Sequence, residues 1–268
     1  MYTILYRDTD RDFCLDEQPF ILKYFPSSSS QRTRVPDNSL VIGRYSVLPF
    51  YKELEWDLET HGCKLINSYK DHSYVASLSN WYADFKDITP ETWFNLQDIP
   101  EKGPFVLKGM TNSMKFQWDT HMYAETKKDA IQVYCRLQDD NLIGSQGICI
   151  RRYMPIVRLD SAPRGLPITK EFRVFFHNGE QLSGAFYWSS HSNNLKAEGK
   201  YPLWHEVPDD FLHKLGKRLT NKTPFVVADI AQLDNGDWIV VELNDGQMSG
   251  LSDNKPDVLY SNLKYVLS

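Results

Sequence analysis

The sequence lacks several features that define common classes of protein. No apolar run approaches the roughly 20 residues that a membrane-spanning helix needs. Arg7, Asp8, Asp10 and Arg11 interrupt the N-terminal segment, so it has no apolar stretch typical of a secretion signal. The 14 glycines form neither GxxxxGK(S/T) nor GxGxxG, the common glycine-rich phosphate-binding motifs. We therefore expect a soluble, cytoplasmic protein that makes no membrane contact and has no standard phosphate loop.

Cysteine is scarce, and charge of one sign is not in large excess. The formal net charge is −5, which gives no global attraction to nucleic acid but leaves room for a local basic groove. Hydrophobic residues make up 41% of the 268, enough for a sizeable core. The cysteines are far apart and form no CxxC pair, so we expect free thiols. They are Cys14, Cys63, Cys135 and Cys149.

Strand and helix patterns alternate along the chain and predict an α/β fold built from α+β lobes. Residues 40–43 and 63–67 read as strands, with a helix between them that opens at Pro49 and is capped by Gly62. A strand, a helix and a strand at this spacing predict a βαβ unit with a parallel pair. Before this unit, the serine run at residues 27–30 predicts a flexible, poorly ordered loop.

Breaker residues predict a boundary near residue 100, because Pro100 is followed by Gly103-Pro104. We therefore expect an N-terminal lobe at 1–100 and a second domain at 101–268. Thr89 and Pro90 have the pattern of a helix start, as N-cap and first residue. Further elements are expected as strands at 105–107, 148–150, 172–176 and 182–186, and as helices at 126–137 and 209–219.

The sharpest geometric prediction is a hairpin between residues 225–233 and 238–244. Asn235-Gly236 lies between these apolar strands and is typical of a two-residue turn in which both residues take positive φ. That turn sets a register with Asp229 opposite Glu242 and Val227 opposite Asn244. Since side chains alternate along a strand, Asp229, Glu242 and Asn244 share one face, provided that the register does not slip by one residue.

This shared face predicts a magnesium site. Two carboxylates directly opposite each other repel, and on a partly buried face they need a counter-charge. Mg²⁺ prefers oxygen ligands, often one or two carboxylates plus substrate phosphates. We therefore predict that Asp229 and Glu242 bind the metal, with the amide oxygen of Asn244 as a third ligand. The alternative at this point is that the acids face solvent or that one of them pairs with an arginine.

Three basic residues are candidates for holding phosphates. Lys108 ends the strand at 105–107 and can point into a cleft, and Lys115 follows in a polar loop. Arg173 shares a strand face with Glu171. Ordinary alternatives stay open for these residues, namely a solvated strand-end lysine for Lys108 and an ion pair with Glu171 for Arg173.

The order of these features resembles that of the ATP-grasp superfamily. Lys108 comes first, then the segment ending in Arg151-Arg152-Tyr153-Met154, then residues 171–175, and finally Asp229 with residues 241–244. The resemblance covers about residues 40–251. One arginine and two lysines, at 173, 108 and 115, are similar to a divergent clade of bacteria and phages proposed to act in peptide tagging or RNA repair.

The resemblance implies a βαβ lobe followed by two lobes that grip ATP, with Mg²⁺ as a second cofactor. Arg173 and Lys115 would act on the transferring phosphoryl group, and Arg152 stands where the family commonly has an acidic residue. The metal ligands implied are again those of the hairpin. The implied nucleotide contacts are Lys108, Lys115, Arg152, Tyr153, Met154 and Glu171.

The implied activity is that of an ATP-dependent carboxylate–amine ligase. Such an enzyme activates a small-molecule or peptide carboxylate as an acylphosphate, which an amine then attacks. One alternative is an RNA- or tRNA-end ligase of the same fold. A second alternative is a non-catalytic module that binds a nucleotide. The RNA alternative needs a basic groove, for which the candidates are Arg151, Arg152, Arg158, Arg164 and Lys170.

Overall fold

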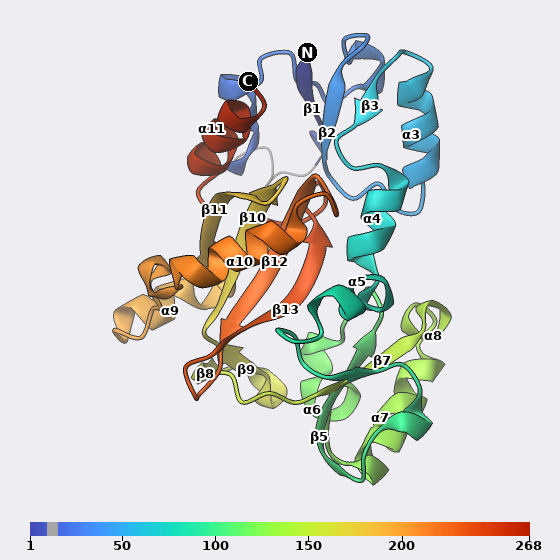
Figure 1. Cartoon of the computed structure of the whole chain (residues 1–268), viewed down its shortest axis with the longest axis vertical. Coiled ribbons are helices and arrows are strands. Elements are labelled where there is room, and N and C mark those ends of the chain that lie inside the picture. The colour runs from blue at the N-terminus through green and yellow to red at the C-terminus, as the bar shows by residue number, and fades with distance from the viewer. Residues whose placement is uncertain (10–15) are drawn as a thin grey trace.

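The computed structural model describes residues 1–9 and 16–268, and Figure 1 shows three parts along its long axis. A parallel sheet lies at the top, a four-stranded antiparallel sheet in the middle and a second four-stranded sheet at the bottom. This mixture of sheets and helices confirms the predicted fold class. Among the described helices, none is both long and apolar enough to cross a membrane. The prediction of a free thiol at Cys14 concerns a residue outside the described ranges.

The N-terminal lobe contains the predicted βαβ unit. Strands β2 (Leu40–Arg44) and β3 (Lys64–Leu65) pair in parallel, and α3 (Tyr51–Glu59) connects them. Apolar side chains of β2 and α3 form one small core. A third strand that the sequence analysis did not identify, β1 (Tyr2–Tyr6), pairs in parallel with the other edge of β2.

The prediction of a flexible loop at the serine run is wrong. Ser29 forms an isolated bridge with Leu5 of β1, and its backbone N–H donates to Ile4 O at 3.1 Å. The Ser28 hydroxyl accepts a hydrogen bond from Ile4 N at 2.9 Å. Because these bonds satisfy the polar groups of β1, the run lies along the edge of the sheet instead of looping away from it.

The predicted helix start at Thr89 is also wrong. Residues Thr92–Trp93 form the short strand β4, which pairs with β7 (Ile148–Arg152). The Thr89 hydroxyl does not cap a helix, because it donates to Val240 O at 2.7 Å in the middle sheet. Two helices that were not predicted precede this segment, α4 (Tyr69–Ala76) and α5 (Leu78–Phe85).

The bottom sheet, which we call the lid sheet, has the order β4-β7-β5-β6. Its two further strands are β5 (Lys102–Gly109) and β6 (Tyr123–Thr126). Helix α7 (Lys127–Asp139) confirms the helix predicted at 126–137, and it begins with a capping box between Thr126 and Asp129. Its apolar side packs against β5 and β7. Two short helices, α6 (Trp118–His121) and α8 (Ile143–Gln146), flank this lobe.

The middle sheet, which we call the central sheet, has the order β11-β10-β12-β13 and is antiparallel throughout. Its strands are β10 (Glu171–His177), β11 (Glu180–Phe186), β12 (Phe225–Gln232) and β13 (Trp238–Asp245). Helices α5 and α10 (Asp209–Leu219) bury one face. On the other face, α2 (Gln18–Tyr24), α11 (Pro256–Val266) and the N-terminal lobe cover one end. The remaining elements are the hairpin β8 (Arg158–Ser161) and β9 (Pro167–Thr169), and α9 (Ser192–Ala197).

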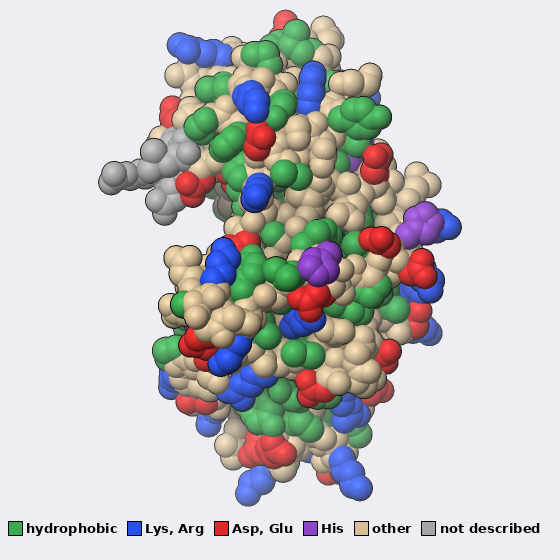
Figure 2. All heavy atoms as spheres, turned by 90° about the vertical axis from the view of Figure 1, so that its left-hand side faces the viewer, with side chains coloured by type: hydrophobic (Ala, Val, Ile, Leu, Met, Phe, Trp, Pro, Cys, Tyr) green, Lys and Arg blue, Asp and Glu red, His purple; other side chains and the backbone are tan. Residues whose placement is uncertain are grey.

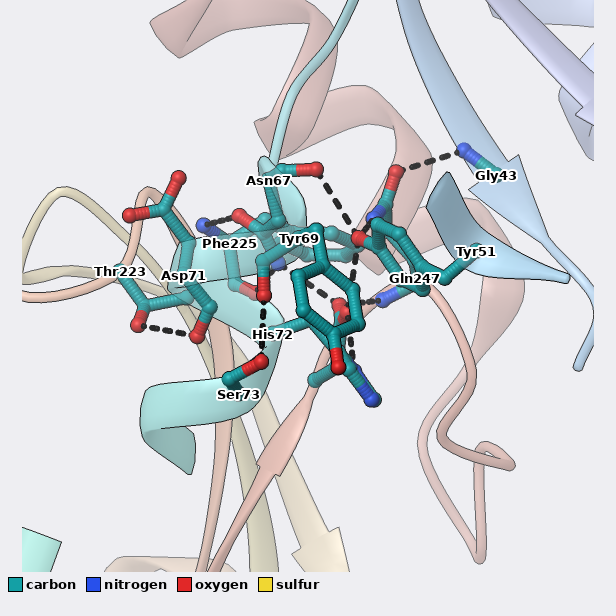
Figure 3. A network of polar contacts seen from close by, with 12 residues as sticks. Gly43, Tyr51, Asn67, Tyr69, Asp71, His72, Ser73, Thr223, Phe225 and Gln247 are labelled. Carbon is teal, nitrogen blue, oxygen red and sulfur yellow. Dashed lines mark hydrogen bonds and ion pairs between the residues drawn. The ribbon is translucent and has the colours of Figure 1, made fainter. Parts of the chain in front are cut away.

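A buried polar network joins the N-terminal lobe to the end of β13 (Figure 3). Its centre is the carboxylate of Asp245, which is 4% exposed. It accepts hydrogen bonds from Asn67 Nδ2 at 2.7 Å, Gln247 N at 2.9 Å and the Tyr51 hydroxyl at 3.2 Å, and it lies 3.2 Å from His72 Nδ1. These bonds fix the C-terminal end of β13 against the N-terminal lobe.

We predict that Asp245→Ala lowers the free energy of unfolding by about 3 kcal/mol, because it leaves several buried donors without an acceptor. Urea denaturation followed by circular dichroism measures the change. The matched control is Asp257→Ala, which breaks an exposed ion pair with Lys23 and should cost no more than about 1 kcal/mol. Equal losses in the two variants would show that the network does not stabilise the fold.

Candidate nucleotide and metal site

The predicted register of the β12–β13 hairpin is confirmed. Asp229 lies opposite Glu242, and Val227 lies opposite Asn244. Asp229 is buried, whereas Glu242 and Asn244 are partly exposed on the same face of the central sheet. The two carboxylates are therefore direct neighbours, as the sequence indicated.

The turn that produces this register differs from the prediction. Leu233 N donates to Asp237 O at 2.8 Å, so the loop between the strands is longer than two residues. Of the Asn235-Gly236 pair, only Gly236 takes a positive φ, of 93°. The prediction of a two-residue turn is therefore wrong, and the observed loop alone would bring Val241 opposite Asp229.

A β-bulge at Val241 corrects the register. The pairing shifts between Ile230 and Asp229, so Val241 is an extra residue and Glu242 returns to the face of Asp229. The carbonyl oxygen of Val241 accepts a hydrogen bond from Arg151 Nη1 at 2.6 Å. Arg151 in turn donates from Nη2 to the Thr89 hydroxyl at 2.7 Å. Arg151 and Thr89 thus hold the bulge, a role that the sequence analysis did not identify.

Cationic side chains balance both carboxylates. Arg173 donates from Nε and Nη2 to the two oxygens of Asp229, each at 2.8 Å, and Asn244 Nδ2 lies 3.5 Å from the same carboxylate. The pairing of one acid with an arginine, left open from the sequence, is therefore present. Arg173 Nη1 also donates to Gly250 O at 3.0 Å.

Glu242 is balanced from the other side of the cleft. Lys108, at the end of β5, reaches across from the lid sheet and donates to Glu242 Oε1. Burial disfavours the charged form of Glu242, but Lys108 and Lys115 outweigh it and lower the pKa to about 2. Glu242 therefore carries its charge at neutral pH and links the lid sheet to the central sheet.

Lys115 lies in a pocket of aromatic and acidic groups. Its Nζ donates to the Tyr187 hydroxyl at 2.6 Å, and it lies 4.5 Å from the centre of that ring. Tyr187 follows β11 and also faces Arg173, whose guanidinium lies 4.8 Å from the ring centre. Burial raises the pKa of Glu171 to about 7, although Lys115 nearby opposes the rise. The sequence analysis missed Tyr187, which lies two residues beyond Ala185, the β11 partner of Arg173.

The residues expected at the hinge lie at the back of the same cleft. Tyr153 N donates to Pro104 O at 3.0 Å, and Met154 packs in a small apolar cluster with Ile156. The Arg152 side chain pairs with Glu91 at 3.3 Å and stacks near aromatic rings of the lid sheet. The hinge arginine thus has an acidic partner of its own.

A cleft lies between the lid sheet and the central sheet and holds about 910 Å³ of space, including its mouth to solvent. Its walls are mainly apolar, and its charged residues gather on one side, as is common in ligand pockets. Arg173, Asp229 and Asn244 lie beyond the cleft lining on the same sheet face. The lining includes Lys108, Lys115, Arg152, Tyr153, Met154, Glu171, Trp188 and Glu242.

The predicted magnesium ligands form a suitable but partial oxygen set. Within residues 1–9 and 16–268, no group of three or more His, Cys, Asp or Glu residues is placed to hold a metal. Asp229, Glu242 and Asn244 supply two carboxylates and one amide. That chemistry fits Mg²⁺, which commonly takes one or two carboxylates and completes its shell with phosphates and water.

The fold and this arrangement define an ATP-grasp protein, in which two lobes enclose a nucleotide cleft. Residues 95–263 match the model of an ATP-grasp domain, family 3 of the clade named for one arginine and two lysines, and the chain belongs to this family. No curated protein matches the sequence.

Solved structures share the fold at low sequence identity. The RimK domain ATP-grasp protein from Sphaerobacter thermophilus DSM 20745 has a TM-score of 0.57 and 14% identity, with full coverage of both chains. D-cycloserine synthetase DcsG has a TM-score of 0.61 and 13% identity, also with full coverage of both. The ATP-grasp ligase PsnB, solved with a precursor variant, Mg and ADP, has a TM-score of 0.60 and 9% identity over 100% of this chain and 98% of its own. At these identities the likeness shows the fold alone.

The raised pKa of Glu171 predicts a pH-dependent stability. A carboxyl that holds its proton more tightly when folded stabilises the protein at low pH, and this contribution is lost as pH rises from about 4.5 through about 7. We expect Glu171→Gln to gain stability relative to wild type between pH 4.5 and 8, by an amount on the order of 2 kcal/mol. Urea denaturation across this pH range measures the difference.

The exposed Glu180, also on the central sheet, provides the matched control. Glu180→Gln should leave the pH dependence of the unfolding free energy unchanged. A constant difference between wild type and Glu171→Gln over the whole range would contradict the assignment.

Proposed function

We propose that this chain is an ATP-dependent ligase that activates a carboxylate as an acylphosphate, which an amine then attacks. The observation that carries the proposal is the charge arrangement across the cleft. Lys108 and Lys115 reach from the lid lobe toward Glu242 and Tyr187, next to the Arg173–Asp229 pair of the central sheet. A triphosphate with its metal presents the complementary charges, because phosphates attract the basic groups and Mg²⁺ attracts the carboxylates.

In this proposal, each predicted residue has a physical role. Lys108 and Lys115 contact phosphates, and Arg173 neutralises charge on the transferring phosphoryl group. The adenine lies against Arg152, Tyr153 and Met154. Asp229, Glu242 and Asn244 hold Mg²⁺, which supplies charge neutralisation at the phosphates when bound. Glu171 lies beside Lys115 and helps to place it.

A second hollow next to Arg173 is suited to the other substrate. Gly250, whose carbonyl accepts from Arg173, lines this hollow together with Arg7, Arg44 and Ser249. It holds about 1470 Å³ of space, including its mouth to solvent, and its walls are largely polar. A hollow that is polar and open at one side admits a peptide as well as a free amino acid. PsnB has been solved with precursor peptide, which supports a peptide substrate here.

The RNA alternative has no support in the structure, because its candidate basic residues are already engaged. Arg151 is buried against Val241 and Thr89. Lys170 pairs with Glu206, and Arg164 pairs with Asp119 at 3.1 Å. Arg158 donates to Ser161. They therefore do not form a free groove for a phosphate backbone.

We expect calorimetry to show ATP binding that Mg²⁺ strengthens at least about tenfold in wild type, and we expect this enhancement to be lost in Glu242→Ala. ATP without Mg²⁺ should bind the variant as well as wild type or better, because Lys108 loses its carboxylate partner. Glu180→Ala, on the same sheet but exposed, is the control and should behave as wild type.

Persistence of the full Mg²⁺ enhancement in Glu242→Ala would overturn the metal assignment. Hydroxylamine in place of the amine then separates a ligase from a binding module, because it traps an acylphosphate as a hydroxamate. Hydroxamate formation with a panel of amino acids and peptides supports the ligase. ATP binding with no consumption of ATP, even in cell extract, supports the module.

A further inference from the structure

Strand β11 forms one edge of the central sheet, away from the reaction cleft. In Figure 1 it is the outermost strand on the left, and Figure 2 views the molecule from that side. Acidic and basic side chains are interspersed on this face, so charge of one sign does not dominate it. An exposed strand edge presents backbone groups that another segment can pair with, unless the protein covers them.

The backbone of β11 alternates between its partner strand and the outside. Tyr187 N donates inward to Glu171 O at 2.9 Å. Two positions on the outer edge are covered, since Leu182 O accepts from Asn262 Nδ2 at 2.7 Å and Phe186 O accepts from Asp253 N at 3.1 Å.

Between these two covered positions, Gly184 turns its N–H and C=O outward by the same alternation. Outside the strand ladder, neither group bonds to any described part of the chain. The outer edge therefore has one uncovered donor and one uncovered acceptor on a single residue.

The hollow beside this edge contains two further polar atoms without partners. Ser183 Oγ and Asn254 Oδ1 both belong to residues of its lining and make no hydrogen bond within the described chain. Their residues are only 5% and 4% exposed, so an unmet hydrogen bond here is costly. The hollow holds about 940 Å³ of space, including its mouth to solvent, and Tyr201, Trp204 and Val258 form its apolar walls.

We propose that the β11 edge at Gly184 binds an extended peptide segment, which pairs one residue with Gly184 and meets Ser183 and Asn254 with polar groups. A peptide residue in extended conformation offers both an N–H and a C=O, which is the complement of Gly184. No other common ligand group supplies a donor and an acceptor at the spacing of a strand. Because Asn262 and Asp253 cover the flanking carbonyls, the pairing is limited to about three residues.

The walls also specify the side chains of the peptide. The central residue points to the side of Gly184, where Trp204 packs so closely that a Cβ on Gly184 would clash with its ring, and an apolar side chain fits there. The two neighbours point to the opposite side, toward Ser183 and Asn254. Asn254 Oδ1 only accepts hydrogen bonds, so those neighbours need a hydroxyl or amide donor. The expected pattern is polar, apolar, polar.

This site is separate from the reaction cleft and does not rest on the proposed ligase activity. Asn254 links the two regions, because its Nδ2 donates to Arg173 O at 3.0 Å, while the residue itself lines the edge hollow. A peptide at the β11 edge would thus be bound near the proposed second-substrate hollow without occupying it.

Selective isotope labelling reports on both regions in one experiment. With carbonyl-¹³C serine and ¹⁵N glycine, only glycines that follow serine give a filtered amide signal, and these are Gly184 and Gly250. The probe is the blocked tripeptide threonine-valine-threonine. We expect it to shift the Gly184 amide and to slow its hydrogen exchange, without shifting Gly250. Mg²⁺ and ATP should shift Gly250, if the proposed function holds, and leave Gly184 in place.

Two changes test the contacts themselves. Ser183→Ala should weaken tripeptide binding about three- to tenfold, while the exposed control Ser145→Ala leaves it unchanged. N-methylation of the central valine should abolish the Gly184 shift without any change to the protein. The proposal is overturned if millimolar tripeptide leaves Gly184 unmoved, if only Gly250 moves, or if the N-methylated probe binds equally well.

Discussion

Two carboxylates placed directly opposite each other on one buried sheet face are the constraint around which this molecule is organised. Asp229 and Glu242 would repel each other if they stood alone. Arg173 takes both oxygens of Asp229 from the neighbouring strand, and Lys108 reaches Glu242 from a different lobe. The charge balance of the pair therefore depends on the lid sheet lying against the central sheet. An anionic ligand with its own cation can replace these contacts on both sides at once, which is the physical basis of the proposed nucleotide site.

The constraint extends to the backbone through the bulge at Val241. Without the extra residue, the observed turn would put Glu242 on the opposite face, among the apolar side chains of α5 and α10. Arg151 from the lid sheet binds the bulged carbonyl, and Thr89 binds both Arg151 and the preceding carbonyl of Val240. The segment before β4 and the end of β7 thus fix the register of a hairpin in another lobe. A structural role explains why Arg151 is buried, in a position where the sequence suggested a surface for RNA.

The sequence predicted those parts of the fold that depend on local patterns. The βαβ unit, α7 and the strands of the central sheet follow from apolar periodicity and from caps such as Thr126. The pairing of Asp229 with Glu242 was also predicted, but the turn on which that prediction rested was wrong, and the bulge compensated for it. Long-range contacts were out of reach. Thr89 has the local pattern of an N-cap, yet its hydroxyl bonds to Val240, about 150 positions later in the chain. Tyr187 joins Lys115 and Arg173 only after the two lobes meet.

The most direct test of the central claim is a double-mutant cycle on the carboxylate pair, read as the dissociation constant of ATP in the presence of Mg²⁺. The variants are Asp229→Asn, Glu242→Gln and the two together. If both carboxylates act through one shared cation, the double variant loses little more affinity than the weaker single variant, and the coupling is at least about 1 kcal/mol. If the two losses simply add, the carboxylates act independently, and the account of a shared metal site is contradicted.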